Sequence, residues 1–437
     1  MNKIILNTIG TPCKAGGGGN SGGGGNTPSA PKWTGHADAE GLKAIGWTDE
    51  DIAYYQANGV NWNAEDDEYH KVTDDNKALY GVLTADNISS YKDRIVYLPK
   101  IDTSAKTKIS FSYYYSLIAI PELDTSNVTS MSEMFSGCYS LVSIPLLDTA
   151  KVTNMSGMFQ YCNSLMSIPL LDTANVTNMS KMFLDCRSLV SIPQLDTAKV
   201  TDMSRMFYGC FPLVSIPQLD TAKVTNMNQM FKYCYSLVSI PQLDTQNVTD
   251  MSSMFAVCTS LMSIPQLNTS KVRDMSYMFG SESSSYNIGC ASLVSIPQLD
   301  TSSVANMSNM FRGCCLTSIP ELDTSNVTSM SNMFQQCYPL RNITLLNMSK
   351  VTSSSYVSGL FGNLFALEEC RVIGVRVSID LSPASKLSKE SLLFLINNEA
   401  ATSAITIKLA SYAYTRLAED ADVVAALAAH PNISLAK

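Results

Sequence analysis

Charge is scarce in this chain, because Asp, Glu, Lys and Arg together make up 16% of its 437 residues and the formal net charge is −8. Such a chain has no general attraction for phosphate backbones or anionic lipid, so we expect no nucleic-acid binding. No stretch approaches the roughly 18 uninterrupted apolar residues of a transmembrane helix, which predicts no membrane insertion. The apolar run Ile4–Leu6 is too short for a signal-peptide core, which predicts a chain made and kept in the cytoplasm.

Histidine, the usual proton carrier in catalysis, is rarer still. The 3 histidines, His36, His70 and His430, stand in segments without a matching nucleophile motif. The glycines at 16–19 and 22–25 lack the Gly-Lys-Ser/Thr ending of a phosphate loop and are typical of a flexible tether. We therefore expect no enzyme activity and no cofactor.

The chain instead carries a repeat that dominates its sequence. An Asp, followed by Thr, recurs at intervals of 24 residues, and Asn stands in its place at Asn268 and Asn347. A longer interval of 32 residues marks an insertion around Gly280–Asn287, and a shorter one of 23 marks a deletion near Cys314–Leu316. The column consists of Asp124, Asp148, Asp172, Asp196, Asp220, Asp244, Asn268, Asp300, Asp323 and Asn347.

Each repeat predicts a short strand (Leu-x-Ser-Ile-Pro-x-Leu), a turn at Asp-Thr, a second extended piece, and one helical turn at Met-Phe-x-x-Cys. A single unit of this kind has an apolar face that only a neighbouring unit buries. The fold class predicted is therefore an α/β repeat, a leucine-rich-repeat solenoid of about ten coils with parallel strands about 4.8 Å apart. In the repeat from Leu141 to Cys162 the apolar positions are Leu141, Ile144, Leu147, Val152, Met155, Met158, Phe159 and Cys162.

The string from Leu123 to Leu141 resembles the BspA-like leucine-rich repeats of bacterial surface proteins. The resemblance covers about Asp102 to Cys370, and it implies adhesion or protein–protein binding without catalytic residues. The first coil departs from it, with Tyr113–Tyr115 where Met-Phe-x-x-Cys would fall, and this indicates a capping variation.

Five segments are predicted from these patterns: an N-terminal anchoring arm (1–15), a Gly-rich linker (16–32), a small α-containing domain (33–98), the solenoid (99–372) and an α/β capping unit (373–437). The small domain holds the 3 tryptophans of the chain, Trp33, Trp47 and Trp62, which we interpret as core anchors. The capping unit is expected to contain a helix opening at Ser388, a strand at 405–409 and a helix at 420–430.

Two columns resemble metal sites and are better explained otherwise. The column cysteines are not paired as Cys-x-x-Cys, so zinc is not expected, and we predict buried free thiols. Each coil supplies one Asp, whereas calcium needs six to eight oxygens, so turn formation explains the Asp-Thr column. The column cysteines are Cys138, Cys162, Cys186, Cys210, Cys234, Cys258, Cys290, Cys314 and Cys337.

The residues beside the Phe and the Cys differ from coil to coil, and equivalent positions should share one edge of the array. They predict an aromatic and cationic stripe suited to protein or sugar binding, although scattered surface aromatics explain them equally well. The polar insertion at Gly280–Asn287 should protrude. The candidate stripe is Tyr161, Arg187, Tyr208, Phe211, Tyr233, Tyr235, Arg312 and Tyr338.

Three functions fit an adhesive repeat array without an export signal. The favoured one is a phage virion fibre, in which residues 1–15 dock against other virion proteins and the solenoid contacts a host surface protein or glycan. Its arm, tether and solenoid resemble fibre proteins of phages that infect Bacteroidales. The alternatives are a bacterial cell-surface adhesin and an intracellular protein-binding scaffold, and in each case a homo-oligomer stays open.

Overall fold

The computed structural model describes residues 103–120, 122–282 and 288–437, which fall into two compact units. The N-terminal unit ends at Asp220, and the C-terminal unit runs from Thr221 to Lys437. The expected arm (1–15), Gly-rich linker (16–32) and small domain (33–98) lie outside the described residues, as does most of the insertion after Gly280.

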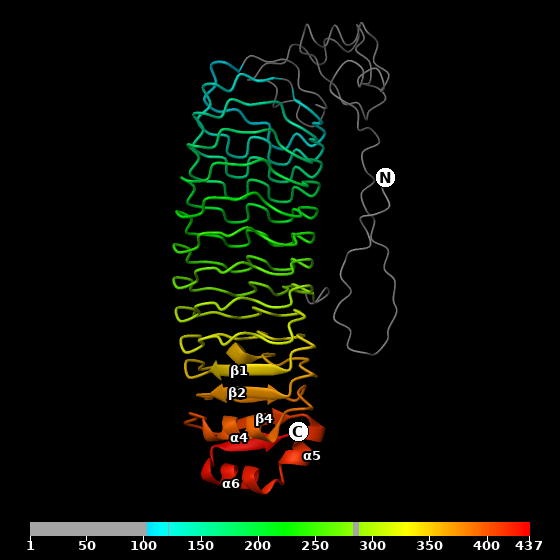
Figure 1. Ribbon diagram of the computed structural model, residues 1–437, viewed down its shortest axis with the longest axis vertical. Coiled ribbons are helices and arrows are strands. Elements are labelled where there is room, and N and C mark those ends of the chain that lie inside the picture. Colours follow the sequence, from blue (N-terminus) through cyan, green and yellow to red (C-terminus); the bar gives the residue numbers. More distant parts are fainter. Residues whose placement is uncertain (1–102, 121, 283–287) are drawn as a thin grey trace, which may run out of the picture. The chain divides into compact units, whose positions relative to one another are not determined.

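In the N-terminal unit the chain winds into coils that lie against one another in the same direction (Figure 1). Parallel bridges join Ser130 to Asn154, Asn154 to Asn178, and Asn178 to Asp202. Bridge partners thus follow the 24-residue interval of the sequence. This in-register stacking brings every sequence column into line along the array.

The columns of Val, Met, Met, Phe and Cys form the core of each coil. In one repeat Val176, Met179, Met182, Phe183 and Cys186 are all 0% exposed. Successive column Phe rings stack nearly parallel, with centroids 5.7 to 5.9 Å apart. Burying a side chain of this size stabilises the fold by about 1.5–3 kcal/mol, so each coil adds several such contributions.

The Asp-Thr pairs form the corners of the coils, as the sequence predicts. Oδ1 of Asp148 accepts a hydrogen bond from the backbone N–H of Ala150 at 3.1 Å, which closes the turn. The hydroxyl of Thr125 in the preceding coil donates to the carbonyl oxygen of Asp148 at 2.9 Å. The corner at Asp148 therefore shapes its own coil and is held to the one before it, whereas the buried hydroxyls of Thr149 and Thr173 form no such bond among the described residues.

The predicted helical turn at Met-Phe-x-x-Cys is wrong. The segment is a series of tight turns, in which Met182 N–H donates to Met179 C=O at 3.2 Å. Lys181 and Asp185 take positive φ values of 57° and 55°, which end any helical path. The N–H of Phe159 donates to the carbonyl of Met182 in the next coil at 2.9 Å, so hydrogen bonds that a helix would keep run between coils.

The expected regular strand at Leu-x-Ser-Ile-Pro-x-Leu is also absent from the described coils of the N-terminal unit. Neighbouring segments pair through single hydrogen bonds, such as Val142 N–H to Ile118 C=O at 3.0 Å and Val190 N–H to Met166 C=O at 3.2 Å. The Pro of each repeat has no N–H, so a continuous ladder has no donor at that position.

The C-terminal unit begins with coils of the same kind and then gains regular structure. Parallel bridges join Asn226 to Asp250 and Asp250 to Asp274. Further along, β1 (Asn342–Asn347) pairs in parallel with β2 (Glu369–Ile373), and the short 3-10 helix η2 (Ser354–Val357) lies between them in sequence.

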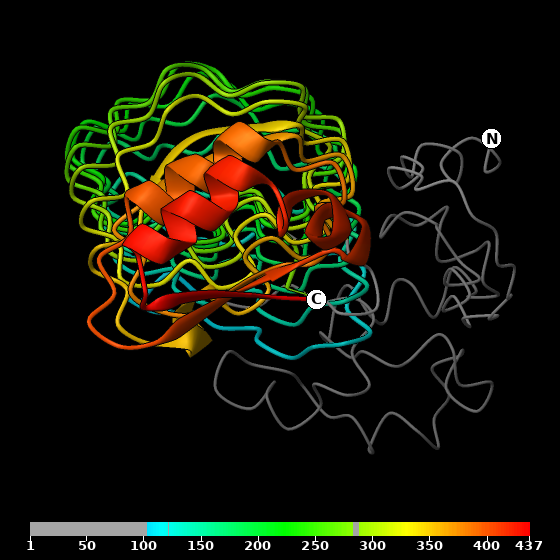
Figure 2. The ribbon, with the colours of Figure 1, turned by 90° about the horizontal axis from the view of Figure 1, so that it is seen from below.

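The last part of the C-terminal unit is a parallel sheet of β3 (Ile379–Leu381), β4 (Ile405–Leu409) and β5 (Ile433–Ala436), in that order. Helices α4 (Lys389–Asn397), α5 (Ser411–Leu417) and α6 (Ala421–Ala429) connect the strands, and α4 and α6 run side by side in Figure 2. Ser388 caps α4 and Asp420 caps α6, as the sequence predicts, whereas α5, β3 and β5 were not expected.

No helix in the described ranges is both long enough and apolar enough to cross a membrane.

Candidate binding surface

The eight residues of the predicted stripe lie on both sides of the buried Cys column, four in each unit. The Cys thiols themselves face inward: the Sγ of Cys186 donates to the carbonyl of Phe159 at 3.0 Å, and burial raises its pKa well above the ordinary value. The prediction of buried free thiols is confirmed for all nine cysteines of the column. The surface therefore depends on the residues that flank the Cys.

In the N-terminal unit the structure brings Arg187 and Phe211 together. The Arg187 guanidinium lies 5.4 Å from the centroid of the Phe211 ring, and its Nε lies 3.3 Å from Oδ1 of Asp185. Burial raises the pKa of Asp185, and the neighbouring Arg187 partly opposes this. Asp185 was missed in the sequence, where its place beside the Cys gave the only signal.

Tyr161 and Tyr208 are half-buried and serve partly to hold the coils together. Tyr161 has a φ of 64°, and its N–H donates to the carbonyl of Leu184 in the next coil at 2.7 Å. The carbonyl of Tyr208 accepts from the N–H of Asp185 at 2.6 Å. Their place in the stripe is therefore set by the backbone, with part of each ring open to solvent.

The most exposed aromatic cluster of the N-terminal unit was not predicted. Tyr113, Tyr115 and Tyr139 are 44%, 42% and 43% exposed. The rings of Tyr115 and Tyr139 stack with centroids 5.1 Å apart, and Tyr113 lies 6.2 Å from Tyr115. Tyr114 between them is buried in the Cys column, and burial raises its pKa. We refer to Tyr113, Tyr115 and Tyr139 as the tyrosine cluster.

In the C-terminal unit, Tyr233 and Tyr235 lie edge to face, with centroids 6.2 Å apart. The ammonium group of Lys232 lies 5.1 Å from the Tyr233 centroid and 2.5 Å from a carboxylate oxygen of Glu282. Burial, and then Glu282, raise the pKa of Tyr233. Glu282 lies near the start of the insertion, so its ion pair with Lys232 holds this part of the loop beside Tyr233.

The remaining two stripe residues lie apart from this group along the C-terminal unit. Tyr338 stacks on Phe365 with centroids 6.1 Å apart, and Phe365, which was not predicted, is 48% exposed. Arg341 and Glu368 form an ion pair of 3.1 Å. Arg312 is half-buried. The predicted stripe is thus several small clusters.

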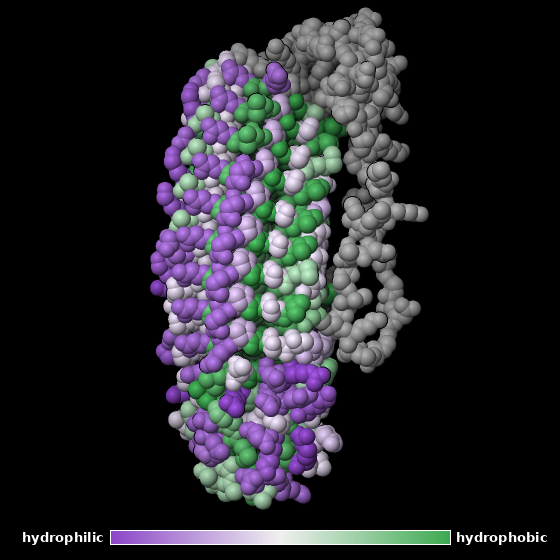
Figure 3. Space-filling model, viewed as in Figure 1, coloured by the Kyte–Doolittle hydropathy of each residue, from purple (hydrophilic) through white to green (hydrophobic). Residues whose placement is uncertain are grey.

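A second surface, also missed in the sequence, consists of exposed aliphatic side chains. They stand at the position after Leu in Leu-x-Ser-Ile-Pro, and Figure 3 shows apolar side chains in a column that crosses successive coils. We call this the aliphatic column. Its most exposed members are Met166 (54%), Val190 (53%) and Val214 (48%) in the N-terminal unit, and Met262 (57%) and Val294 (67%) in the C-terminal unit.

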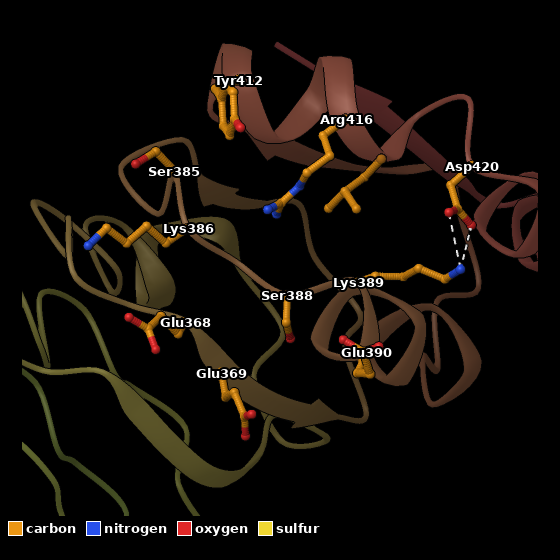
Figure 4. A pocket seen from close by; sticks show the side chains of 11 residues that line it. Glu368, Glu369, Ser385, Lys386, Ser388, Lys389, Glu390, Tyr412, Arg416 and Asp420 are labelled. Atoms are coloured by element: carbon orange, nitrogen blue, oxygen red, sulfur yellow. Dashed lines mark hydrogen bonds and ion pairs between the residues drawn. The ribbon is translucent and has the colours of Figure 1, made fainter.

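The C-terminal unit also contains a charged pocket of about 640 Å³ between β2, α4 and α5 (Figure 4). Lys389 binds Asp420 at 3.0 Å and Asp422 at 2.5 Å, and the Arg416 guanidinium donates to the carbonyl of Leu387. These cations are already engaged with groups of the same unit, which favours a structural role for the pocket.

Metal-binding and proton-transfer groups are the remaining candidates among the described residues. In those ranges, no group of three His, Cys, Asp or Glu side chains is placed to hold a metal ion. His430 lies 3.4 Å from Glu399 at the end of α6, and His36 and His70 lie outside the described residues.

Several solved structures are similar to this chain. A leucine-rich-repeat protein of T. pallidum is 23% identical, with 38% of this chain and 76% of that chain covered and a TM-score of 0.29. An internalin of Listeria monocytogenes is 11% identical, with 83% and 92% covered and a TM-score of 0.23. A leucine-rich-repeat protein of Leptospira interrogans is 10% identical, with 81% and 100% covered and a TM-score of 0.18. No curated protein matches.

A family described as "Mycoplasma protein of unknown function, DUF285" matches residues 107–213, 189–289 and 283–366. These ranges contain the coils in which the sequence predicts leucine-rich repeats, and bridges between successive coils in the structure follow the period of those repeats. Because the three matches together span more than half of the sequence, the chain belongs to the DUF285 family.

Proposed function

We propose that this protein is a non-catalytic attachment protein, whose coils present exposed side chains to a partner surface. The observation that carries the proposal is the tyrosine cluster, in which three rings remain more than 40% exposed and two of them stack. Tyr is enriched at the energetic centres of protein interfaces because it combines a large apolar area with a polar hydroxyl. The buried columns build the same scaffold in each coil, so the outward side chains determine what is bound.

The finer form of the proposal is a virion fibre of a bacteriophage. Residues 1–15 dock against other virion proteins, residues 16–32 form a tether, and the coils contact a protein or glycan of the host surface. The protein then lies on the virion surface. Support comes from the order of these segments in the sequence and from the repeat family, which suits a binding role.

Mass spectrometry of density-purified phage particles from the source culture tests this placement. We expect the chain at a fixed ratio to the other virion proteins. Absence from particles together with recovery from cell envelopes would favour a bacterial adhesin, and recovery from the cytoplasm alone would favour a protein-binding scaffold.

The binding role itself is tested with the double variant Tyr115→Ala/Tyr139→Ala. Both side chains are largely exposed, so we expect weaker attachment to host cells and a change in stability within about 0.5 kcal/mol per site. The matched control is Val190→Ala/Val214→Ala, which shortens two exposed side chains of the aliphatic column in the same unit. Unchanged attachment of the tyrosine variant combined with a large loss of stability would show that the cluster is structural.

A further inference from the structure

A shallow groove of about 810 Å³ crosses the corners of consecutive coils in the N-terminal unit. Leu146 and Leu170 project into it and are 72% and 65% exposed, the highest values for large aliphatic side chains in that unit. The acidic side chains that line the groove are Glu122, Asp124, Asp148, Asp172 and Asp196, and its lining includes no Lys or Arg. We call it the acidic groove.

The negative charge of the groove is not required by the fold. Asp148 and Asp172 each accept one turn hydrogen bond on Oδ1, from Ala150 and Ala174, at 3.1 Å. In the C-terminal unit, Asn268 occupies the same column and accepts the same bond from the N–H of Ser270 at 3.2 Å. A neutral amide therefore builds this turn, and the carboxylates supply a charge that the turn does not use.

Three of the groove's carboxylates also lack an ionic partner in the part of the chain that the structure describes. Among the described residues, Asp148, Asp172 and Asp196 form no ion pair. The lysines that follow in the same corners are engaged elsewhere, since Lys151 donates to Oδ1 of Asn127 at 3.1 Å and Lys199 to Oδ1 of Asn175 at 2.7 Å. Like charges repeated at coil spacing repel one another, and a bound cation would remove that repulsion.

The two leucines also leave backbone acceptors open. In five later coils the residue at this position is Gln, and in several of them its amide donates to the carbonyl of the equivalent residue in the next coil, as Gln194 does to Gln218 at 2.6 Å. Leu146 and Leu170 have no such donor. Within the described chain, the carbonyl oxygens of Leu170 and Gln194 accept no hydrogen bond. The groove thus combines apolar area, free carbonyls and carboxylates, and it offers no cation of its own.

We propose that the acidic groove binds a cationic amphipathic segment of a partner protein, whose apolar side chains cover Leu146 and Leu170 while its Lys or Arg side chains reach the carboxylates and carbonyls. Apolar contact supplies affinity, and the charges supply selectivity and a faster encounter. The inference rests on the proposed function, because it names the chemistry of one partner of the same coils. A metal ion fits less well, because calcium needs six to eight converging oxygens and each coil contributes one corner Asp.

The test uses the full chain and three synthetic peptides of equal length, built from alternating Leu and Lys, Leu and Glu, or Ser and Lys. Binding is followed by fluorescence anisotropy at low and high salt. We expect the Leu-Lys peptide to bind most tightly and to lose affinity as salt rises. Two double variants should lower the affinity for the Leu-Lys peptide roughly tenfold or more. One is Asp148→Asn/Asp172→Asn, which keeps the turns. The other is Leu146→Gln/Leu170→Gln, which introduces the Gln found at this position in five later coils.

The matched control is Asp244→Asn/Asp300→Asn, which removes the same charge from corners of the C-terminal unit that carry Gln in place of Leu. It should bind the Leu-Lys peptide as the unaltered chain does. Equal losses in the control and groove variants, or equal binding of the Leu-Glu peptide, would overturn the proposal. So would a rise in thermal stability with calcium alone that Asp148→Asn/Asp172→Asn abolishes, because the groove would then be a metal site.

Attachment to host cells, measured with the same variants, separates this inference from the proposed function. If the chain attaches normally but the Leu-Lys peptide does not bind, the acidic groove is refuted and the attachment role stands. If the peptide binds at the groove but the chain attaches to no cell or particle, the groove is supported and the attachment role fails.

Discussion

The rings of Phe159 and Phe183 stack at a centroid distance of 5.7 Å with an angle of 10° between their planes. Both rings are 0% exposed, and Phe183 repeats the contact with Phe207 at 5.7 Å on its other face. Each such ring therefore packs against the Phe rings of both neighbouring coils. The loss of one should disturb the stacking on both sides, which is the behaviour expected of an array held by nearest-neighbour contacts.

Replacing Phe183 by Ala should lower the free energy of unfolding by about 3–5 kcal/mol, because it removes a buried ring and leaves a cavity between two others. Urea denaturation followed by circular dichroism measures the change. Val190→Ala, an exposed substitution seven positions on, should stay within about 0.5 kcal/mol. A Phe183→Ala value as small as that of Val190→Ala would show that the stacked column does not hold the coils.

Gly209 has a φ of 71°, and a Cβ added there would lie 2.5 Å from Oδ1 of Asp185. Gly209→Ala should therefore destabilise the N-terminal unit by about 1–3 kcal/mol, because the backbone strain and the contact act together. Thermal unfolding measures the loss. In the Asp185→Gly background the contact is gone, so the same substitution should cost less, and an equal cost in both backgrounds would assign the whole effect to the backbone.

The buried columns were predictable from the sequence because buried positions repeat with the same residue types at a fixed interval. Phe183 and Cys186 recur at equivalent places in neighbouring repeats, and a lone repeat offers no interior for them. The sequence predicts a helical turn here because Met155 and Met158 are three residues apart, a spacing that suits both a helix and a series of tight turns. The two structures differ in the carbonyl that accepts from each backbone N–H. Many of these carbonyls lie in another coil.

The outer surface was less predictable for the same reason. Leu146 and Leu170 resemble core leucines by residue type, and only the position of the corner places them outside. Tyr115 and Tyr139 are 24 residues apart and each follows the Cys position of its coil. The first coil has Tyr114 in place of the Cys, so the sequence alone does not align Tyr115 with Tyr139. A sequence column predicts which residues align, and it leaves open which side of the coil they face.

Burial raises the pKa of the Cys314 and Cys370 thiols from 9.0 to about 12. Since the folded pKa is the higher one, the unfolded chain loses these protons first as the pH rises. Their contribution to stability is thus complete below about pH 9 and falls between about pH 9 and pH 12. Urea midpoints measured across this range should decline, and Cys370→Ala should decline less steeply. Equal slopes for the variant and the unaltered chain would contradict this.

Leu170→Gln should leave the stability of the chain unchanged or raise it by up to about 1 kcal/mol, although it replaces an aliphatic side chain by a polar one. Leu170 is 65% exposed and loses little apolar burial, while a Gln amide there is positioned to donate to the carbonyl of Gln194. The reverse substitution, Gln194→Leu, removes the existing bond to Gln218 and should cost about 1 kcal/mol. Differential scanning calorimetry compares the two. Equal destabilisation by the two substitutions would show that the Gln side chains at this position do not stabilise the coils through hydrogen bonds. The exposed Leu170 would then have to be explained by packing alone.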